Sequence, residues 1–213
     1  MTTYRILEGQ FLAPTPAGAY LAASRPGNDA ARRFILRLLG LGRSPDSGAA
    51  TVARLAGEAS GDAGELLHRL QSLALVQGLA EPRAAPEGAF ENLLPPLLAR
   101  LSGSGRCVLA DSQGFYLAAS GFAHEAAEGL SALAADLAGV HDRHAQLLGA
   151  NLSMQSGGWG LLDASGNSQL GFWPLHLGAN TFVLAIGGVP RFNTPEFVSL
   201  AWALTRRYAP EDS

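Results

Sequence analysis

Lysine is absent from this sequence, in which all fifteen residues of the lysine and arginine class are arginine. The absence excludes three mechanisms that require a lysine: the phosphate-binding loop ending in Gly-Lys-Ser/Thr, Schiff-base chemistry and the Ser-x-x-Lys hydrolases. Cysteine is nearly absent, because Cys107 is the single one, which excludes an intrachain disulfide and a zinc site built from cysteines. No Gly-x-Ser-x-Gly motif occurs, so the nucleophile elbow of α/β-hydrolases is missing too.

Long apolar runs are also missing. No stretch approaches the ~18 to 20 apolar residues that a membrane-spanning helix needs. The first residues, MTTYRILEGQ, lack the basic-then-apolar order of a signal peptide. We therefore expect a cytoplasmic protein of bacterial style with no membrane insertion.

Charged residues are few, at 15% of the chain, against 47% hydrophobic residues. That proportion is enough to build a hydrophobic core and excludes a wholly disordered chain. The formal net charge of −3 makes a strongly basic nucleic-acid binder unlikely for the molecule as a whole. The chain of 213 residues fits one large domain or two small ones.

The charge is distributed unevenly along the chain. Residues 1–86 hold nine arginines and seven acids, whereas residues 87–213 hold six arginines and eleven acids. Between these parts, residues 81–88 (EPRAAPEG) contain two prolines and several small residues, which is typical of a linker. We therefore predict two domains, 1–86 and 89–213, with the linker at about 81–88.

The first domain shows helical spacing in three segments. Apolar residues recur at three- and four-residue intervals from Asp29 to Leu39, and a shorter helix is expected from about Ala49 to Glu58. A third helix follows Gly61, with Asp62 as its N-cap and Leu66, Leu67, Leu70 and Leu73 as its apolar face. The chain opens with a short apolar stretch at residues 4–7. Residues 75–80 are expected to be extended, and the residues after Pro14, Pro16 and Gly18 are expected to be irregular.

This order resembles a winged helix-turn-helix, on the stretch TVARLAGEASGDAGELLHRLQSLALVQG. The resemblance implies DNA binding through the third helix, which would enter the major groove. That helix offers only His68, Arg69 and Gln71 as base or phosphate contacts, beside the acids Asp62 and Glu65. A packing or partner-binding role is favoured, and DNA binding stays an alternative.

The second domain is expected to alternate helices and strands in a defined order. Residues 90–101 are helical in spacing, with the regular helix beginning at Pro95-Pro96, and a long helix runs from His124 to about Leu148. Thr194 and Pro195 then start a final helix that ends near Tyr208. Strands are predicted at residues 106–111, 115–120, 158–164, 169–175 and 181–187.

This order resembles the roadblock/dynein light chain family over residues ~89–209. The segments that carry the resemblance are VLADSQGFYLAASG, the alanine-rich helix after it and the hairpin QLGFWPLHLGANTFVLAIGG. It implies an α+β fold of order αββαβββα with a five-stranded antiparallel sheet. It also implies dimerisation and a non-enzymatic role as a regulator or platform for Ras-like GTPases or motor complexes. Residues 149–157 depart from the pattern, because they lengthen the link before the third strand.

The residues that are able to carry chemistry form no convincing site. His141 and His144 share a helix face, but no further ligand lies near them in sequence, so solvated histidines are the favoured interpretation. Cys107 is placed in an apolar strand, and Asp111 and Asp163 lie where strands meet turns. We predict no catalytic residue, no cofactor and no metal.

The long helix is the predicted dimer interface. Ala126, Leu130, Leu133 and Leu137 fill the arc that one sheet face needs, whereas Ala127, Ala134 and Ala138 extend the apolar surface around the helix. Small residues allow a second backbone to approach closely. The residues predicted to form the interface are Ala127, Leu130, Ala134, Leu137 and Ala138.

The sequence-level hypothesis is therefore a non-catalytic homodimer that engages a small GTPase or another roadblock-like subunit. Two alternatives stay open: a DNA-binding transcriptional regulator that dimerises through its second domain, and a small-molecule sensor. Finally, neighbouring Phe172 and Trp173 are expected to face opposite sides of their strand, with one of them under a helix or a partner.

Overall fold

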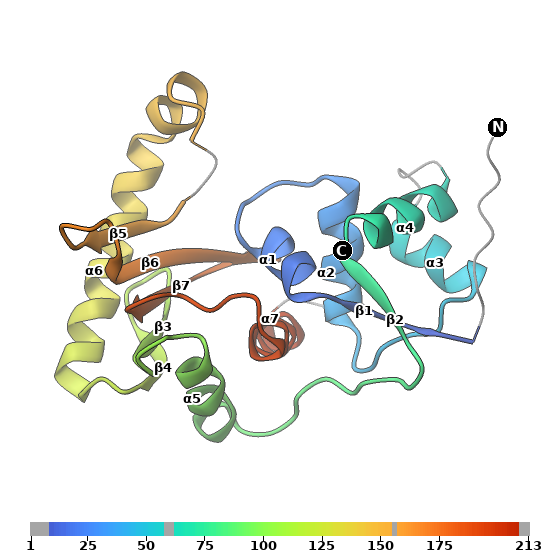
Figure 1. Ribbon diagram of the computed structural model, residues 1–213, viewed down its shortest axis with the longest axis horizontal. Coiled ribbons are helices and arrows are strands. Elements are labelled where there is room, and N and C mark those ends of the chain that lie inside the picture. The colour runs from blue at the N-terminus through green and yellow to red at the C-terminus, as the bar shows by residue number, and fades with distance from the viewer. Residues whose placement is uncertain (1–8, 58–61, 155–156, 209–213) are drawn as a thin grey trace.

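The fold is mixed α+β, as predicted, in a computed structural model that describes residues 9–57, 62–154 and 157–208 (Figure 1). The apolar stretch at residues 4–7 lies outside the described residues. The helices are α1 (Pro16–Ala23), α2 (Ala30–Gly40), α3 (Ala49–Ala56), α4 (Ala63–Ser72), α5 (Phe90–Arg100), α6 (His124–Arg143), the π-helix η2 (Gln146–Asn151) and α7 (Pro195–Tyr208). The strands are β1 (Phe11–Pro14), β2 (Val76–Leu79), β3 (Cys107–Asp111), β4 (Tyr116–Ser120), β5 (Trp159–Leu162), β6 (Ser168–Leu177) and β7 (Asn180–Gly187).

A five-stranded sheet in the order β4-β3-β7-β6-β5 organises the second half of the chain. All four neighbouring pairs are antiparallel, which confirms the predicted sheet. The hairpins β3–β4, β5–β6 and β6–β7 join consecutive strands, and the pairing of β3 with β7 unites the first hairpin with the last three strands. This pairing buries β3 and β7 at the centre of the sheet.

Helices cover both faces of the sheet. Because side chains alternate along a strand, Cys107 and Leu109 of β3 face the side that carries α1, α2, α5 and α7, whereas Val108 and Ala110 face α6. The same alternation separates Phe172, which is buried on the α6 side, from Trp173. Trp173 packs on the opposite side, with its ring 5.5 Å from that of Phe192, so the two neighbouring aromatic residues face opposite sides as predicted.

Side-chain caps begin helices α1, α2 and α4 of the first half, whereas α3 begins at Gly48 without one. Asp29 Oδ1 accepts a hydrogen bond from the backbone N–H of Arg32 at 3.0 Å, and Asp62 Oδ1 accepts from those of Gly64 and Glu65. These bonds satisfy N–H groups that the first turn of a helix leaves free. The predicted N-cap Asp62 is thereby confirmed, although Leu73, which was assigned to the apolar face of α4, is exposed.

The residues after Pro14, Pro16 and Gly18 were predicted to be irregular, and this prediction is wrong, because they form the helix α1. Proline fits the first position of a helix, where its missing N–H would have no intrahelical partner. Pro16 occupies that position, and Thr15 Oγ1 accepts from the N–H of Gly18 at 3.1 Å. The prolines therefore mark the start of α1 rather than prevent it.

The start of α5 corrects a second expectation. The helix begins at Phe90 and includes Pro95 and Pro96, instead of beginning at those prolines. A proline at these positions removes bonds to the carbonyls of Glu91 and Asn92. Both residues are exposed, so water can satisfy their carbonyls, while Leu94 and Leu98 are buried and hold the helix against the sheet.

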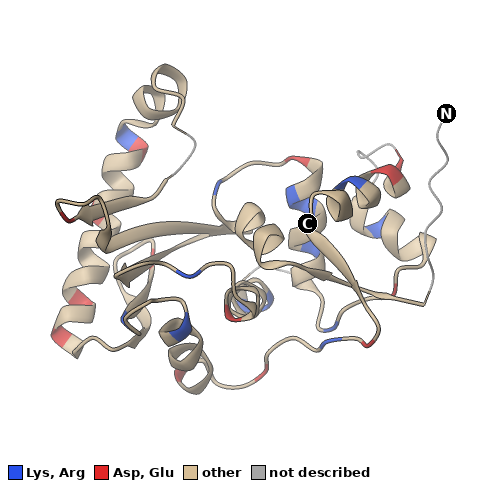
Figure 2. Cartoon of the chain, in the orientation of Figure 1, with Lys and Arg blue, Asp and Glu red and all other residues tan. Residues whose placement is uncertain are grey.

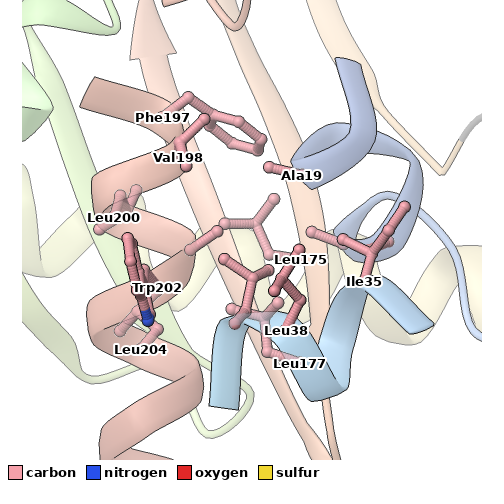
Figure 3. Close-up of a cluster of buried hydrophobic side chains, with 14 of the residues drawn as sticks. Ala19, Ile35, Leu38, Leu175, Leu177, Phe197, Val198, Leu200, Trp202 and Leu204 are labelled. Carbon is pink, nitrogen blue, oxygen red and sulfur yellow. The ribbon is translucent and has the colours of Figure 1, made fainter. Parts of the chain in front are cut away.

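One hydrophobic cluster joins the two halves of the chain. It includes Leu38 of α2 and Ala19 of α1 together with Leu175 of β6 and Phe197 of α7 (Figure 3). Trp202 in α7 donates its indole N–H to the carbonyl of Leu41, at the C-terminal end of α2, at 2.7 Å. The first two helices therefore lie on the same sheet face as α7.

Two polar connections reinforce this contact. The buried Arg32 of α2 donates to the backbone carbonyls of Ala22, Gly27 and His176, the last of which belongs to β6. The segment at residues 81–88 is also hydrogen-bonded, because the carbonyl of Arg83 accepts from Ser44 N and the N–H of Ala85 donates to Gly42 O. The linker segment thus lies along residues 42–44.

Candidate interaction surface

Helix α6 presents a different face to the sheet than the sequence suggested. Ala127 and Ala134, which were assigned to a partner-facing surface, are 0% and 1% exposed and pack on the sheet. Their small side chains let the helix backbone approach the strands closely. Leu130 and Leu137 are half-buried beside them, whereas Leu133, which was assigned to the sheet face, is exposed.

The predicted interface is therefore corrected residue by residue. Ala127 and Ala134 are covered by the chain itself and are not available to a partner. Leu130, Leu137 and Ala138 keep partial exposure at the sides of the helix. The error has a physical cause: a 3.6-residue period shows that an apolar stripe exists, but two adjacent stripes on an alanine-rich helix satisfy it equally well.

Acidic residues predominate along α6 (Figure 2). Exposed Glu125 and Glu128 lie near the start of the helix, and exposed Asp136 and Asp142 lie in its second half, beside Arg143 in the last turn. Glu125 in the first turn and Arg143 in the last turn suit the helix dipole.

The edge strand β5 is the most exposed apolar part of the sheet. Leu161 and Leu162 are 63% and 64% exposed, and among the described residues no strand pairs with the outer side of β5. Leu161 is opposite Leu170, which packs on the α6 side, but Leu161 itself is not covered by α6, although the last turn of that helix contacts Trp159 at the start of β5. An exposed hydrophobic edge strand presents unpaired N–H and C=O groups that can pair with another chain.

A projecting tip continues this surface. After α6 the chain forms η2, which extends beyond the sheet at the end of the molecule opposite α3 and α4 (Figure 1). Leu147, Leu152 and Met154 are exposed on and just after η2.

The histidines that the sequence singled out do not assemble a metal site. His141 Nδ1 lies 3.4 Å from the indole nitrogen of Trp159, which links the last turn of α6 to the start of β5. His144 is exposed at the C-terminal end of the helix. Over the part of the chain that the structure describes, no group of three or more His, Cys, Asp or Glu residues is arranged to hold a metal ion.

The other candidate reactive residues, Cys107, Asp111 and Asp163, have structural roles. Burial raises the pKa of the Cys107 thiol far above its ordinary value, so this residue is not a thiolate nucleophile. Asp111 Oδ1 accepts from the N–H groups of Gln113 and Phe115 in the β3–β4 turn. The backbone N–H of Asn167 lowers the pKa of Asp163, whose carboxylate likewise closes the β5–β6 turn.

The side chains predicted for DNA contact lie together on the outer face of α4. His68, Arg69 and Gln71 are all exposed, as a recognition helix would require. Glu65 is exposed one turn before Arg69, and the carboxylate of Asp62 caps the helix. The face therefore carries both signs of charge, so it offers little neutralisation of phosphates.

Comparisons with known proteins add no relative: no model of a protein family, no curated protein and no solved structure matches this chain. Within the described residues, no helix is both long enough and apolar enough to cross a membrane. The arguments for function therefore depend on the surface described above.

Proposed function

We propose that the protein is a non-catalytic homodimer that acts as a regulator or scaffold and engages a small Ras-like GTPase or another roadblock-like subunit. The observation that carries this proposal is the edge strand β5, which exposes Leu161 and Leu162 on a sheet edge that no described strand covers. Natural proteins usually protect such an edge with charge, proline or a covering segment. Pairing with a second copy would protect it here.

The exposed face of α6 is able to take part in the same symmetric contact. Where the two-fold axis is perpendicular to α6, the two helices run antiparallel. Exposed Leu133, near the middle of α6, would then lie close to the two-fold axis.

The element order supports the roadblock-like assignment of the second half. From α5 onward the chain forms a helix, two strands, a long helix, the short helix η2, three strands and a final helix. Apart from η2, this is the order that the resemblance implies. A symmetric pair of such sheets would offer a broad surface to a GTPase.

Light scattering coupled to gel filtration tests the dimer. Wild-type protein at tens of micromolar should have twice the 22.1 kDa mass of one chain. Leu161→Glu and Leu133→Glu should each give a monomer with an unchanged circular dichroism spectrum, because both side chains are exposed in a single chain. Leu73→Glu, on the distant helix α4, is the matched control and should stay dimeric.

Two outcomes would overturn the dimer. One is a monomeric wild type at the same concentration, and the other is a set of variants that all remain dimeric.

A pull-down from the native extract tests the partner class. Full-length protein should retain a small GTPase or a roadblock-like subunit, identified by mass spectrometry and absent from a control bait. If the protein is a dimer but retains neither kind of partner, the proposed partner class is wrong, whereas the proposed dimer is not affected.

DNA binding is a second candidate because His68, Arg69 and Gln71 are exposed together on α4. With Glu65 on the same face, affinity for random duplex DNA at physiological salt should be no tighter than the ~10⁻⁴ to 10⁻⁶ M of non-specific binding. Fluorescence anisotropy with a labelled duplex measures this. Sub-micromolar, salt-dependent binding that Arg69→Ala weakens would favour the DNA-binding regulator.

A further inference from the structure

A chain of three polar side chains lies at the start of α6, away from the β5 edge. The hydroxyl of Tyr116 is 2.6 Å from Nδ1 of His124, and Nε2 of His124 is 3.4 Å from Oε1 of Glu128. The rings of Tyr116 and His124 meet edge to face at 5.7 Å. A hydroxyl, an imidazole and a carboxylate thus follow one another in the order that activates nucleophilic hydroxyls.

A β-bulge places Tyr116 in this chain. In the pairing of β3 with β4, Leu109 is opposite Ala118 but Ala110 is opposite Tyr116, so Leu117 has no partner of its own. Leu117 and Ala118 consequently pack on the α7 side, and Tyr116 returns to the α6 side. Regular alternation would have pointed Tyr116 away from His124. Bulges of this kind re-aim side chains and are frequent beside functional sites.

The helix supplies the other two groups. His124 is the first residue of α6, and Glu128 follows one turn later on the same face. With Nδ1 accepting the phenolic proton, the imidazole carries its own proton on Nε2, which points toward Glu128. The carboxylate therefore orients the imidazole as a base. The side chains of His124 and Glu128 are 63% and 60% exposed, so a reagent in solvent can reach them.

We infer that Tyr116 is an activated phenol that accepts an acyl group from a neutral acyl donor, with His124 as the base and Glu128 as its positioning residue. The phenolic oxygen forms a bond to the carbonyl carbon while its proton moves to Nδ1 of His124. The bond from that carbon to the leaving group then breaks, and the leaving group takes the proton from His124. The carboxylates of Glu125 and Glu128 disfavour an anionic phosphoryl donor here, which is why the donor is neutral.

The other described tyrosines lack this environment. Burial raises the pKa of Tyr20, which is packed against Phe192 and Phe197. Tyr208 stacks on Phe90 and Phe182. These two residues serve as internal references. If only the accessibility of the phenol set the rate of modification, the rate at Tyr116 would not depend on His124.

Acetylation by N-acetylimidazole, followed by peptide mass spectrometry, tests the inference on full-length protein. Tyr116 should be acetylated faster than Tyr20 and Tyr208, and hydroxylamine should remove the label, as expected for a phenyl ester. His124→Gln should slow labelling of Tyr116 about tenfold, less than the ~10²-fold or more that a base gives in an enclosed active site. Glu128→Gln should slow it by a smaller factor.

The control is His144→Gln, which removes an exposed histidine at the opposite end of α6 and should leave the Tyr116 rate unchanged. Each rate is expressed relative to Tyr208 in the same sample, so a general loosening of the fold would raise both rates and be recognised. If Tyr116 reacts no faster than Tyr208, or if His124→Gln leaves its relative rate within twofold of wild type, the inference is wrong.

Discussion

Cys107 shows at the scale of one residue how burial decides reactivity. It is the first residue of the central strand β3, it has no exposed surface, and burial raises the pKa of its thiol. Folded protein should therefore react negligibly with a water-soluble aromatic disulfide over an hour, followed by absorbance. One thiol per chain should react at once in denaturant. Stoichiometric reaction under native conditions would show that β3 opens readily, contrary to its place at the centre of the sheet.

His176 makes stability depend on pH. It is half-buried on β6, with Nδ1 3.2 Å from Oγ1 of Thr181, and its backbone carbonyl accepts from Arg32. Desolvation lowers the pKa of His176, the positive charge of Arg32 and His141 lowers it further, and Asp142 opposes the shift. The folded state thus binds the proton less readily than the unfolded state.

The sign of the effect follows from this difference. The contribution of His176 to the free energy of unfolding is fully present above the ordinary histidine pKa of about 6.5. It decreases as the pH falls below that value toward the lower pKa of the folded state, by at most ~1.4 kcal/mol per pH unit. Urea unfolding at a series of pH values between 7.5 and 5 should show this decline, with a smaller slope in His176→Gln. His144→Gln, at an exposed site, should keep the wild-type slope. Equal slopes in all three proteins would remove His176 as the cause.

At the scale of elements, patterns within one segment predicted structure well. Asp62 caps α4 through two N–H groups next to it in sequence, and the alternating side chains of β3 face opposite layers as expected. Patterns that depend on a partner segment were harder to interpret. The sheet-facing stripe of α6 was misassigned because Ala127 and Leu133 are both apolar, and only the packing on the sheet distinguishes them.

Some features of the candidate sites left no usable signal in the sequence. The exposure of Leu161 depends on which residues of β5 are covered by α6, and no local sequence pattern indicates this. The contact of Tyr116 with His124 requires a bulge at Leu117, and the sequence FYLAAS there is that of an ordinary strand. In the sequence, Leu161 and Leu162 form only a short apolar run that ends at Asp163.

Gly18 gives a prediction for the packing of α1. A Cβ at this position would lie 2.0 Å from the backbone carbonyl oxygen of Leu75, which cannot move without disturbing β2. Gly18→Ala should therefore lower the free energy of unfolding by about 1–3 kcal/mol, as overpacking does. Gly129→Ala, in the exposed middle of α6 with no atom near, should instead raise it by about 0.5–1 kcal/mol. Denaturant titration of both variants measures these changes in the free energy of unfolding. Equal effects of the same sign would contradict the close approach of Gly18 to the carbonyl of Leu75.

At the scale of the whole molecule, the hydrophobic cluster shared by α1, α2, β6 and α7 joins the two predicted domains in one folded body. The hydrogen bond from Trp202 to the carbonyl of Leu41 crosses this junction. Calorimetry should show one cooperative transition for the full chain. Trp202→Phe should lower the stability of that single transition by about 1–3 kcal/mol, because it leaves a carbonyl without its donor. Two separated transitions in the wild type would show that the halves unfold independently.

The contact between α2 and α7 also has a consequence for biosynthesis. The ribosome releases α1 and α2 early, but the strand and helix that cover their apolar side chains are among the last segments to emerge. Roughly 170 residues separate the end of α2 from the end of α7, which corresponds to roughly 8–34 s of translation at 5–20 residues per second. During that interval Leu38 and Ile35 have no sheet to pack on. The nascent chain is therefore a natural client for chaperones that hold apolar helices until synthesis is complete.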